Sequence, residues 1–199
     1  MLHKIVNLSS LYVILDEIDA KITAKVQATG CPICGSPLHM SRYPRKPRGI
    51  PTAIHRKRWW RLSLCCSQRD CRKRVTPPSV TFLGRKWYPG CIVVAVCSGL
   101  QGQAGIAMPI TRMIELFSVS WKTVKRWRQW WSKWVPKTAL WRSLQGRFAK
   151  PIDTLQLPRS LLERIVGTAQ EQLLSLLRLV GPLTTESVTW EKSTVFCGG

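Results

Sequence analysis

Two groups of cysteines supply the residues in this chain whose type and spacing could do chemistry. Cys31 and Cys34 lie in the sequence CPICG, and a second group lies in CCSQRDCRKR, which begins at Cys65. Thiolate sulfurs on two such turns form the donor set that Zn²⁺ takes in closed, tetrahedral structural sites. Neighbouring residues on a strand point to opposite sides, so only one of Cys65 and Cys66 can join Cys71. We favour Cys66 and predict that Zn²⁺ is bound by Cys31, Cys34, Cys66 and Cys71, with Cys65 as the alternative to Cys66.

The cysteines have other interpretations. They could be a set of buried thiols, or the CxxC could be redox-active, although no thioredoxin-like βαβ pattern surrounds it. His39 or His55 could replace one cysteine as a ligand. Cys91, Cys97 and Cys197 lack paired spacing, and we interpret them as core or tail residues. We therefore expect a closed structural site.

The chain is strongly basic around the second cysteine group. It carries 31 Lys and Arg against 10 Asp and Glu, a net charge of +21. A single acid, Asp70, stands among the many Lys and Arg of residues 42–74. Such a run is often a solvated face, but its density and single sign favour phosphate contact. We predict contacts to the DNA backbone from Arg42, Arg45, Lys46, Arg48, Arg56, Lys57, Arg58, Arg72, Lys73 and Arg74.

A second basic element spans residues 109–131, PITRMIELFSVSWKTVKRWRQWW. A short helix with an apolar stripe is followed by a three-residue turn and a helix that Ser120 can cap, which is typical of a helix-turn-helix unit. The second helix of such a unit enters the major groove of DNA. An amphipathic helix pair in a small bundle is the alternative. We predict that the bases are contacted by Trp121, Lys122, Lys125, Arg126 and Gln129.

Tryptophan is unusually frequent in the same region. On the predicted second helix, Val124, Trp127, Trp131 and Trp134 share one face, which favours core packing over a platform for stacking on bases. Trp130 lies off that stripe, so the prediction of core packing does not extend to it.

Together these motifs resemble the zinc-ribbon plus helix-turn-helix region of bacterial insertion-sequence transposases and related mobile-element proteins. The resemblance covers about half of the chain and is carried by CPICG (31–35), LCCSQRDCRKRVTPPS (64–79), FLGRKWYPG (82–90) and SVSWKTVKRWRQWW (118–131). It implies binding to the DNA at the ends of a mobile element. In that family a separate RNase H-like domain carries the acidic catalytic triad. The ten acids of this chain are scattered, and we see no strands to hold such a triad, so we predict no catalysis.

The patterns predict an α+β fold, mostly α: a small zinc β-ribbon, a helical helix-turn-helix domain and a C-terminal amphipathic helix. The predicted divisions are an N-terminal helix (1–20), the ribbon with its basic loop (21–78), the helix-turn-helix domain (79–148), a linker with the amphipathic helix (149–181) and a tail (182–199). Strands are predicted at about 21–28, 37–43 and 58–65. Helices are predicted over about 89–100, from 109, from 120 and over 159–180, with a break allowed at Gly167.

Double-stranded DNA is the expected partner. RNA or single-stranded nucleic acid is the alternative, as for a subunit of a larger recombination or ribonucleoprotein complex, and a transcriptional regulator is a further one. The helix at 159–180 could pack on its own domain, form a homodimer or bind a protein partner. No apolar run approaches the roughly 18 residues of a spanning helix, and we find no secretory signal. We expect a cytoplasmic, nucleoid-associated bacterial protein without a membrane role.

Overall fold

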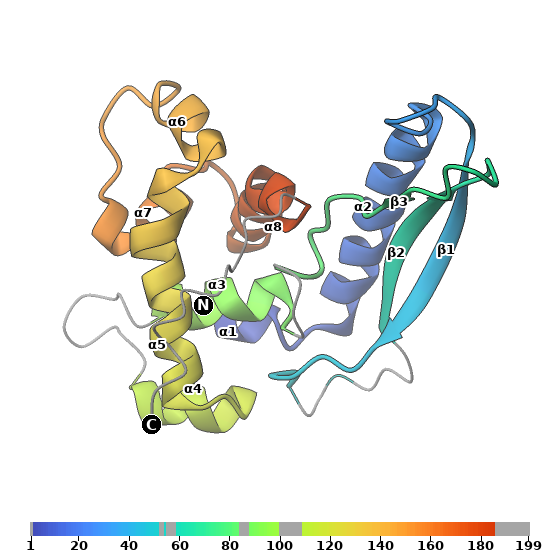
Figure 1. Ribbon diagram of the computed structural model, residues 1–199. Helices are drawn as coiled ribbons and strands as arrows, with labels where there is room; N and C mark the ends of the chain where they lie inside the picture. The colour runs from blue at the N-terminus through green and yellow to red at the C-terminus, as the bar shows by residue number, and fades with distance from the viewer. Residues whose placement is uncertain (1, 52–53, 55–58, 84–87, 100–108, 186–199) are drawn as a thin grey trace, which may run out of the picture.

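The chain folds into a mostly helical body with a small antiparallel sheet at one side, and α2 runs along the sheet (Figure 1). The computed structural model describes residues 2–51, 54, 59–83, 88–99 and 109–185. The predicted fold class, α+β with helix predominant, is confirmed.

The N-terminal helix corrects the interpretation of residues 21–28, for which the alternation predicts a strand. After a short α1 (Leu2–Ile5), the single helix α2 (Ser9–Ala28) continues through that stretch. Ile18, Ile22 and Val26 follow one another at four-residue steps, so the same sequence also fits a helical face. The alternation depended on counting alanines as apolar, but alanine is the strongest helix former. The strand prediction was wrong because two periods fitted one short segment.

The sheet consists of β1 (Leu38–Arg45), β2 (Trp59–Cys66) and β3 (Arg74–Val75), in that spatial order and all antiparallel. β1 extends two residues beyond the predicted strand, into the segment expected to be loop. Leu38 pairs with Cys66 at one end of the hairpin, and Arg45 pairs with Trp59 at the other. This register brings the residues before β1 next to those after β2, which is where both cysteine groups lie.

The far end of the hairpin is built into the main core. The Trp59 ring meets Tyr12 of α2 edge-on, with ring centroids 5.2 Å apart, and also meets Phe82 at 6.3 Å. Near the opposite end, the Gln27 side-chain amide donates to the Leu38 carbonyl over 2.8 Å. α2 therefore braces the hairpin along its length.

A buried carboxylate joins α2 to the segment after the sheet. Asp19 accepts hydrogen bonds from the Ser79 hydroxyl and from the Val80 backbone N–H, both at 2.6 Å. The Ser79 backbone N–H in turn donates to the Thr184 hydroxyl over 2.9 Å. Because Asp19 is 7% exposed, these donors replace water as its partners. The N-terminal helix, the segment after the sheet and the C-terminal part of the described chain are tied together here.

The helical body is built from the elements that follow the sheet. They are α3 (Gly90–Gly99), α4 (Ile110–Phe117), α5 (Trp121–Gln129), a π-helical turn (Trp130–Trp134), a 3₁₀ turn (Val135–Lys137), α6 (Ala139–Gln145), a second 3₁₀ turn (Thr154–Gln156) and α7 (Arg159–Leu162); α8 (Ala169–Val180) and a final 3₁₀ turn (Gly181–Thr184) complete the body. The predicted helices at 89–100, 109 and 120 are found at these positions. α3 is apolar on all sides and lies at the centre of the core, buried from Gly90 to Ser98.

The predicted helix over 159–180 is interrupted, as the sequence allowed. Gly167 has φ +126, a backbone conformation that favours glycine, and it lies between α7 and α8. Leu173, Leu176 and Leu177 of α8 are each fully buried in the main core. Packing on its own domain therefore accounts for the apolar face that suggested a dimer.

Candidate metal centre and nucleic-acid surface

Four cysteine sulfurs meet at the end of the sheet where β1 begins and β2 ends. The Sγ atoms of Cys31, Cys34, Cys66 and Cys71 all lie within 4.8 Å of one another. The Cys31 and Cys71 sulfurs are 3.7 Å apart, and those of Cys34 and Cys66 are 3.4 Å apart. A tetrahedral site with Zn–S bonds of about 2.3 Å separates its sulfurs by about 3.8 Å, whereas a disulfide brings them to about 2 Å. The cluster matches the dimensions of a four-thiolate metal site.

The first cysteine turn is closed by its own backbone. The Gly35 N–H donates to the Cys31 carbonyl over 2.8 Å, and the Cys31 N–H donates to the Ser36 carbonyl over 2.9 Å. Gly30 has φ +75, and a Cβ there would lie 2.7 Å from the Gly35 carbonyl oxygen. Glycine is required at this position because the two chain segments approach so closely. The turn thereby holds Cys31 and Cys34 on one side of the cluster.

The second turn resolves the choice between Cys65 and Cys66. The Cys66 N–H donates to the Lys73 carbonyl over 2.9 Å, and the Cys71 N–H donates to the Gln68 carbonyl over 3.2 Å. Within the described residues, Cys66 belongs to the sulfur cluster and Cys65 does not. The Cys65 sulfur instead lies 3.7 Å from the Cys66 carbonyl oxygen. The prediction that only one of these neighbouring cysteines joins the group is confirmed, the favoured Cys66 is the one that does, and the grouping of the other three cysteines with it is confirmed as well.

The thiols of the cluster differ in acidity. Hydrogen bonds from the Ser36 side chain and backbone, with a further one from Cys66, lower the pKa of Cys34 to about 6. Burial raises the pKa of the Cys66 thiol to about 12. Since a metal binds thiolate, occupation of the site would release a proton from Cys66 at neutral pH. Four thiolates leave no open position, so Zn²⁺ would stabilise the fold here and would not activate water.

The remaining cysteines are placed as expected where the structure describes them. Cys91 and Cys97 are fully buried in α3. Burial raises the pKa of Cys91 to about 12 and raises the pKa of Cys97 as well, so neither is a reactive thiolate. Their interpretation as core residues is confirmed. Cys197 and the candidate ligand His55 lie outside the described residues, and His39 is exposed on β1, outside the sulfur cluster.

The basic residues of β1 and the following loop are exposed or half-buried, and aromatic rings fix some of them. The Arg42 guanidinium lies 4.8 Å from the centre of the Trp60 ring, and that of Arg45 lies 4.6 Å from the centre of the Tyr43 ring. Such stacking holds a guanidinium in place against the face of the ring. Further exposed basic residues are Lys46, Arg48, Arg72, Lys73 and Arg74, whereas Arg56, Lys57 and Arg58 lie outside the described residues.

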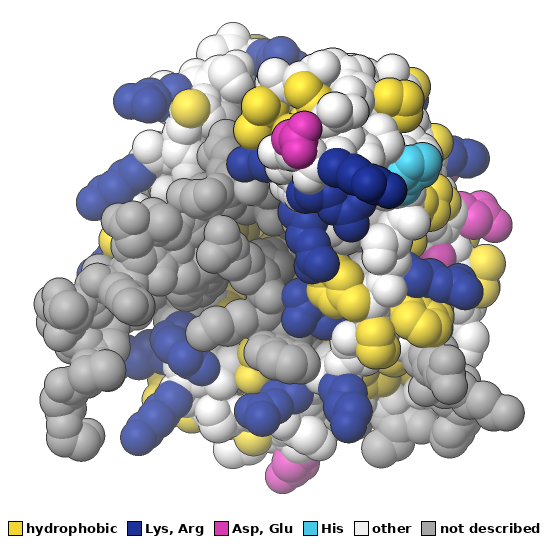
Figure 2. Space-filling model, turned by 45° about the vertical axis from the view of Figure 1, so that its right-hand side comes forward, with side chains coloured by type: hydrophobic (Ala, Val, Ile, Leu, Met, Phe, Trp, Pro, Cys, Tyr) yellow, Lys and Arg dark blue, Asp and Glu magenta, His cyan; other side chains and the backbone are white. Residues whose placement is uncertain are grey.

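Figure 2 brings the sheet side forward and shows Lys and Arg side chains gathered in a band across this face, with few acidic side chains among them. Arg61 of the basic run is removed from this surface because it is 6% exposed and donates to the Pro77 carbonyl over 2.6 Å. Burial lowers the pKa of Arg61, and the nearby Asp19 opposes that shift. Trp59, Arg61 and Ser63 occupy alternate positions on β2, and all three are buried. Because alternate residues of a strand share one face, the position of Arg61 two residues after Trp59 could have indicated that it is buried.

α4 and α5 begin and end close to where the sequence predicts, with three residues between them. Ser118 ends α4 in the left-handed conformation (φ 46), and the Ser120 hydroxyl accepts a hydrogen bond from the Thr123 N–H over 3.3 Å at the start of α5. Val124 is fully buried. On the opposite side of α5 the residues predicted to contact bases are exposed, except that Gln129 is half-buried: Trp121, Lys122, Lys125, Arg126 and Gln129.

The tryptophans after α5 differ from the expectation. Trp127 and Trp131 are buried as predicted, but Trp130 is also buried, at 8% exposed, and its ring meets Trp131 edge-on at 4.8 Å. Trp134, expected on the buried face, is 46% exposed and lies 5.8 Å from the Lys137 ammonium. The π-helical turn over 130–134 explains the exchange, because its wider turn breaks the 3.6-residue period used to assign the faces.

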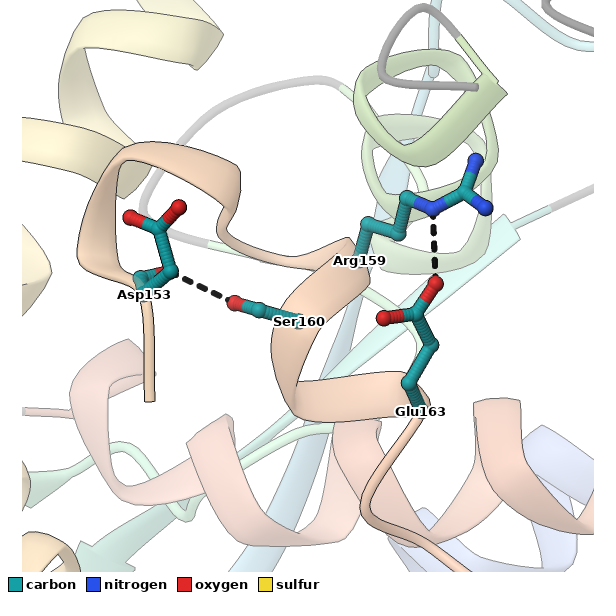
Figure 3. Close-up of polar contacts among 4 residues, drawn as sticks. All are labelled: Asp153, Arg159, Ser160 and Glu163. Carbon is teal, nitrogen blue, oxygen red and sulfur yellow. Dashed lines mark hydrogen bonds and ion pairs between the residues drawn. The ribbon is translucent and has the colours of Figure 1, made fainter. Parts of the chain in front are cut away.

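Asp153 and Glu163, two acidic residues in the C-terminal half of the chain, stabilise the local structure around them (Figure 3). The Asp153 carboxylate accepts a hydrogen bond from the Leu155 N–H over 2.9 Å and caps a 3₁₀ turn, while its backbone carbonyl accepts from the Ser160 hydroxyl over 2.7 Å. Glu163 forms an ion pair with Arg159 over 2.8 Å, one helical turn away. Both acids therefore have a structural explanation.

Comparison with protein-family models, with curated proteins and with solved structures finds no match to this chain. Among the described residues, no helix combines the length and the apolar character that crossing a membrane requires.

Proposed function

We propose that this chain is a zinc-containing, sequence-specific DNA-binding protein that is associated with a transposon or another mobile element and lacks a catalytic domain of its own. The DNA-binding part of this proposal is carried by the two-sided burial of α5. One side of this helix is locked into the core, while the other side presents Trp121, Lys122, Lys125 and Arg126 to solvent. The association with a mobile element rests on the motif resemblance described above. A role on DNA would place the chain with the bacterial nucleoid.

The two basic regions would divide the work of binding. Lysine and arginine side chains on a helix can donate to guanine in the major groove, and this contact discriminates between bases. The Arg42 to Arg48 segment and the Arg72 to Arg74 segment would contact phosphates, which position a protein without reading sequence. Zn²⁺ at the four cysteines would fix the sheet that presents both of these segments.

Selection of binding sites from a random duplex pool, followed by titration of the selected duplex and of a random duplex, tests the proposal. Lys125→Ala should weaken binding to the selected duplex by about 1–3 kcal/mol and should narrow the difference between the two duplexes. The double variant Arg45→Ala, Arg48→Ala should weaken both duplexes alike and flatten the dependence on salt. Recovery of no preferred sequence from the pool would contradict sequence-specific binding.

A second candidate, binding of RNA or single-stranded nucleic acid, is favoured by the exposed rings of Trp121 and Trp134 beside basic residues. Competition among duplex DNA, single-stranded DNA and structured RNA of equal length separates the two. The second candidate would be favoured if single strands or RNA compete more strongly than duplex DNA, and if Trp134→Ala weakens the binding of those single strands.

A further inference from the structure

The basic loop after β1 and the α4–α5 turn are far apart in sequence but lie against each other. Gly49 is buried at this contact and has φ +78. A Cβ on Gly49 would lie 3.2 Å from a methyl group of Val119 and 3.4 Å from the Phe117 carbonyl oxygen. Gly49 therefore lets the loop approach the turn more closely than another residue would.

The surface that receives Gly49 is part of the core. Phe117 and Val119 are 1% and 2% exposed. The Tyr88 ring, which a Cβ on Gly49 would approach to 3.5 Å, meets Trp127 of α5 edge-on at 4.8 Å. The next residues of the loop also join the core, since Pro51 is buried and Ile50 packs against it. The loop is consequently fixed relative to α5.

This contact sets an upper limit on the distance between the two basic segments. Arg48 directly precedes Gly49, and Ser120, the cap of α5, directly follows Val119. A Cβ on Gly49 would lie 3.2 Å from the Val119 methyl, so the Cα atoms of these two residues are at most about 8 Å apart. One further step of about 3.8 Å at each end places the Cα atoms of Arg48 and Ser120 at most about 15 Å apart. One turn of B-DNA measures about 34 Å, and its major groove is about 12 Å wide. Both segments can reach a single duplex within one turn.

We propose that the basic loop, residues 45–49, and the N-terminal half of α5 form one surface that binds one DNA duplex, with the loop on the phosphates that border the groove occupied by α5. This inference rests on the proposed function and adds that both basic segments bind the same duplex within one turn. Gly49 is a positioning residue: it contacts no DNA but sets the register between the phosphate contacts of Arg48 and the base contacts of α5. Arg45, stacked on Tyr43, lies at the base of the same loop.

A scan of the selected duplex with single neutral methylphosphonate linkages tests this arrangement. Where a variant lacks the side chain that contacts a given phosphate, replacing that phosphate with a methylphosphonate should no longer change the affinity. Arg48→Ala should lose sensitivity at one or two phosphates within about ten base pairs of the bases whose readout Lys122→Ala impairs. Its salt slope should fall by about 0.9 for each phosphate that the variant no longer neutralises.

The exposed basic residue Lys150 provides the matched control. Lys150→Ala removes the same charge from the chain at a position outside the proposed surface, so it should change sensitivity at no phosphate. Gly49→Ala keeps every charge, and it should shift or abolish the phosphate sensitivity due to Arg48 while leaving the bases read by α5 unchanged. Gly146→Ala, where a Cβ meets nothing within 4 Å, is the comparison for folding.

The outcomes separate this inference from the proposed function. Sequence-specific binding that persists while Arg48→Ala alters no phosphate, or alters phosphates more than one turn away, would overturn the single surface and leave DNA binding by α5 intact. Failure to bind any duplex would overturn both. Arg48 is exposed, so its variant remains informative even if Gly49→Ala does not fold.

Discussion

The metal end of the sheet and the helical body are stabilised by different means. Around the sulfur cluster, the buried apolar residues are only Cys31, Leu38, Leu64 and Cys66 among those described, with a few partly buried neighbours. The helical body instead packs α3 and α8 with the tryptophans of the α5 region into one large core. A small apolar cluster offsets little of the entropy of ordering its chain, so we expect an ion held by the four sulfurs to stabilise this end of the sheet, whereas the body has a large core of its own.

Loss of a metal ligand should have the largest effect, and it should be confined to one region. Cys66→Ser is expected to abolish zinc binding and to unfold the cysteine turns and the adjoining ends of β1 and β2, because structural zinc contributes about 10–16 kcal/mol of apparent binding energy in small zinc-dependent peptides. Metal content by mass spectrometry and amide hydrogen exchange would measure both. Exchange should accelerate around Leu38 and Leu64, while α8 should stay protected.

Cys65→Ser is the control, because Cys65 adjoins Cys66 but its sulfur lies outside the cluster. This variant should bind zinc normally. Equal loss of zinc in both variants would show that the site requires both cysteines, and retention of zinc by Cys66→Ser would show that Cys65 can replace Cys66. Global unfolding of Cys66→Ser would remove the contrast between the two regions.

A cavity in the helical body should have the reverse pattern. Leu176 is fully buried in α8, and Leu176→Ala should lower the free energy of unfolding by about 2–5 kcal/mol while one zinc ion stays bound. Urea unfolding followed by tryptophan fluorescence would give the change, with Leu155→Ala as the exposed comparison. Release of zinc at the same urea concentration as the loss of fluorescence would show that the regions unfold as one unit.

The contrast between the regions also explains what the sequence could predict. The two cysteine groups could be identified because their residue type and spacing are those of a four-thiolate site. Strand alternation indicated that only one of Cys65 and Cys66 joins the cluster, but it did not decide which. The helices α3, α4 and α5 could be assigned because α3 is apolar on all sides and because the apolar residues of α4 and α5 recur at three- and four-residue steps. The segment 21–28 was misassigned because helical and strand periods both fitted it, and its contacts with the sheet are too distant in sequence to be read from the pattern.

Two parts of the candidate site depend on structure that local patterns do not encode. The exchange of Trp130 and Trp134 follows from a π-helical turn, which the sequence does not announce. The contact of Gly49 with Val119 joins residues seventy positions apart. A glycine after a run of basic residues predicts a turn, but it does not indicate what the turn touches.

The junction between the two regions should respond to pH. Burial raises the pKa of Asp19, and hydrogen bonds from Ser79 and Val80 only partly oppose it. The folded chain then holds this proton more tightly than the unfolded chain does. The contribution of Asp19 to stability is full below the unfolded pKa of 3.8 and declines as pH rises through the folded pKa.

Asp19→Asn should remove that decline, since an amide does not titrate, and its oxygen can still accept from Val80. Asp19→Ala should cost about 1–3 kcal/mol at neutral pH because it leaves buried donors without a partner. Thermal unfolding of the three proteins between pH 4 and pH 8 would provide the measurement. Parallel pH profiles for the wild type and Asp19→Asn would assign the pH dependence to other groups.

The smallest predicted effect concerns the turn of the α4–α5 pair. Ser118 adopts φ 46 and ψ 44 and is exposed, and a side chain in this left-handed conformation costs about 1–2 kcal/mol relative to glycine before the entropy of the more flexible unfolded chain is counted. Ser118→Gly should therefore stabilise the helical body by up to about 1 kcal/mol and leave zinc affinity unchanged. Ser118→Ala keeps the strain and should not stabilise the body. If Ser118→Gly also slowed exchange at the cysteine turns, the stability of the body would reach the metal end through the hairpin, and the two regions would be coupled more tightly than their separate clusters imply.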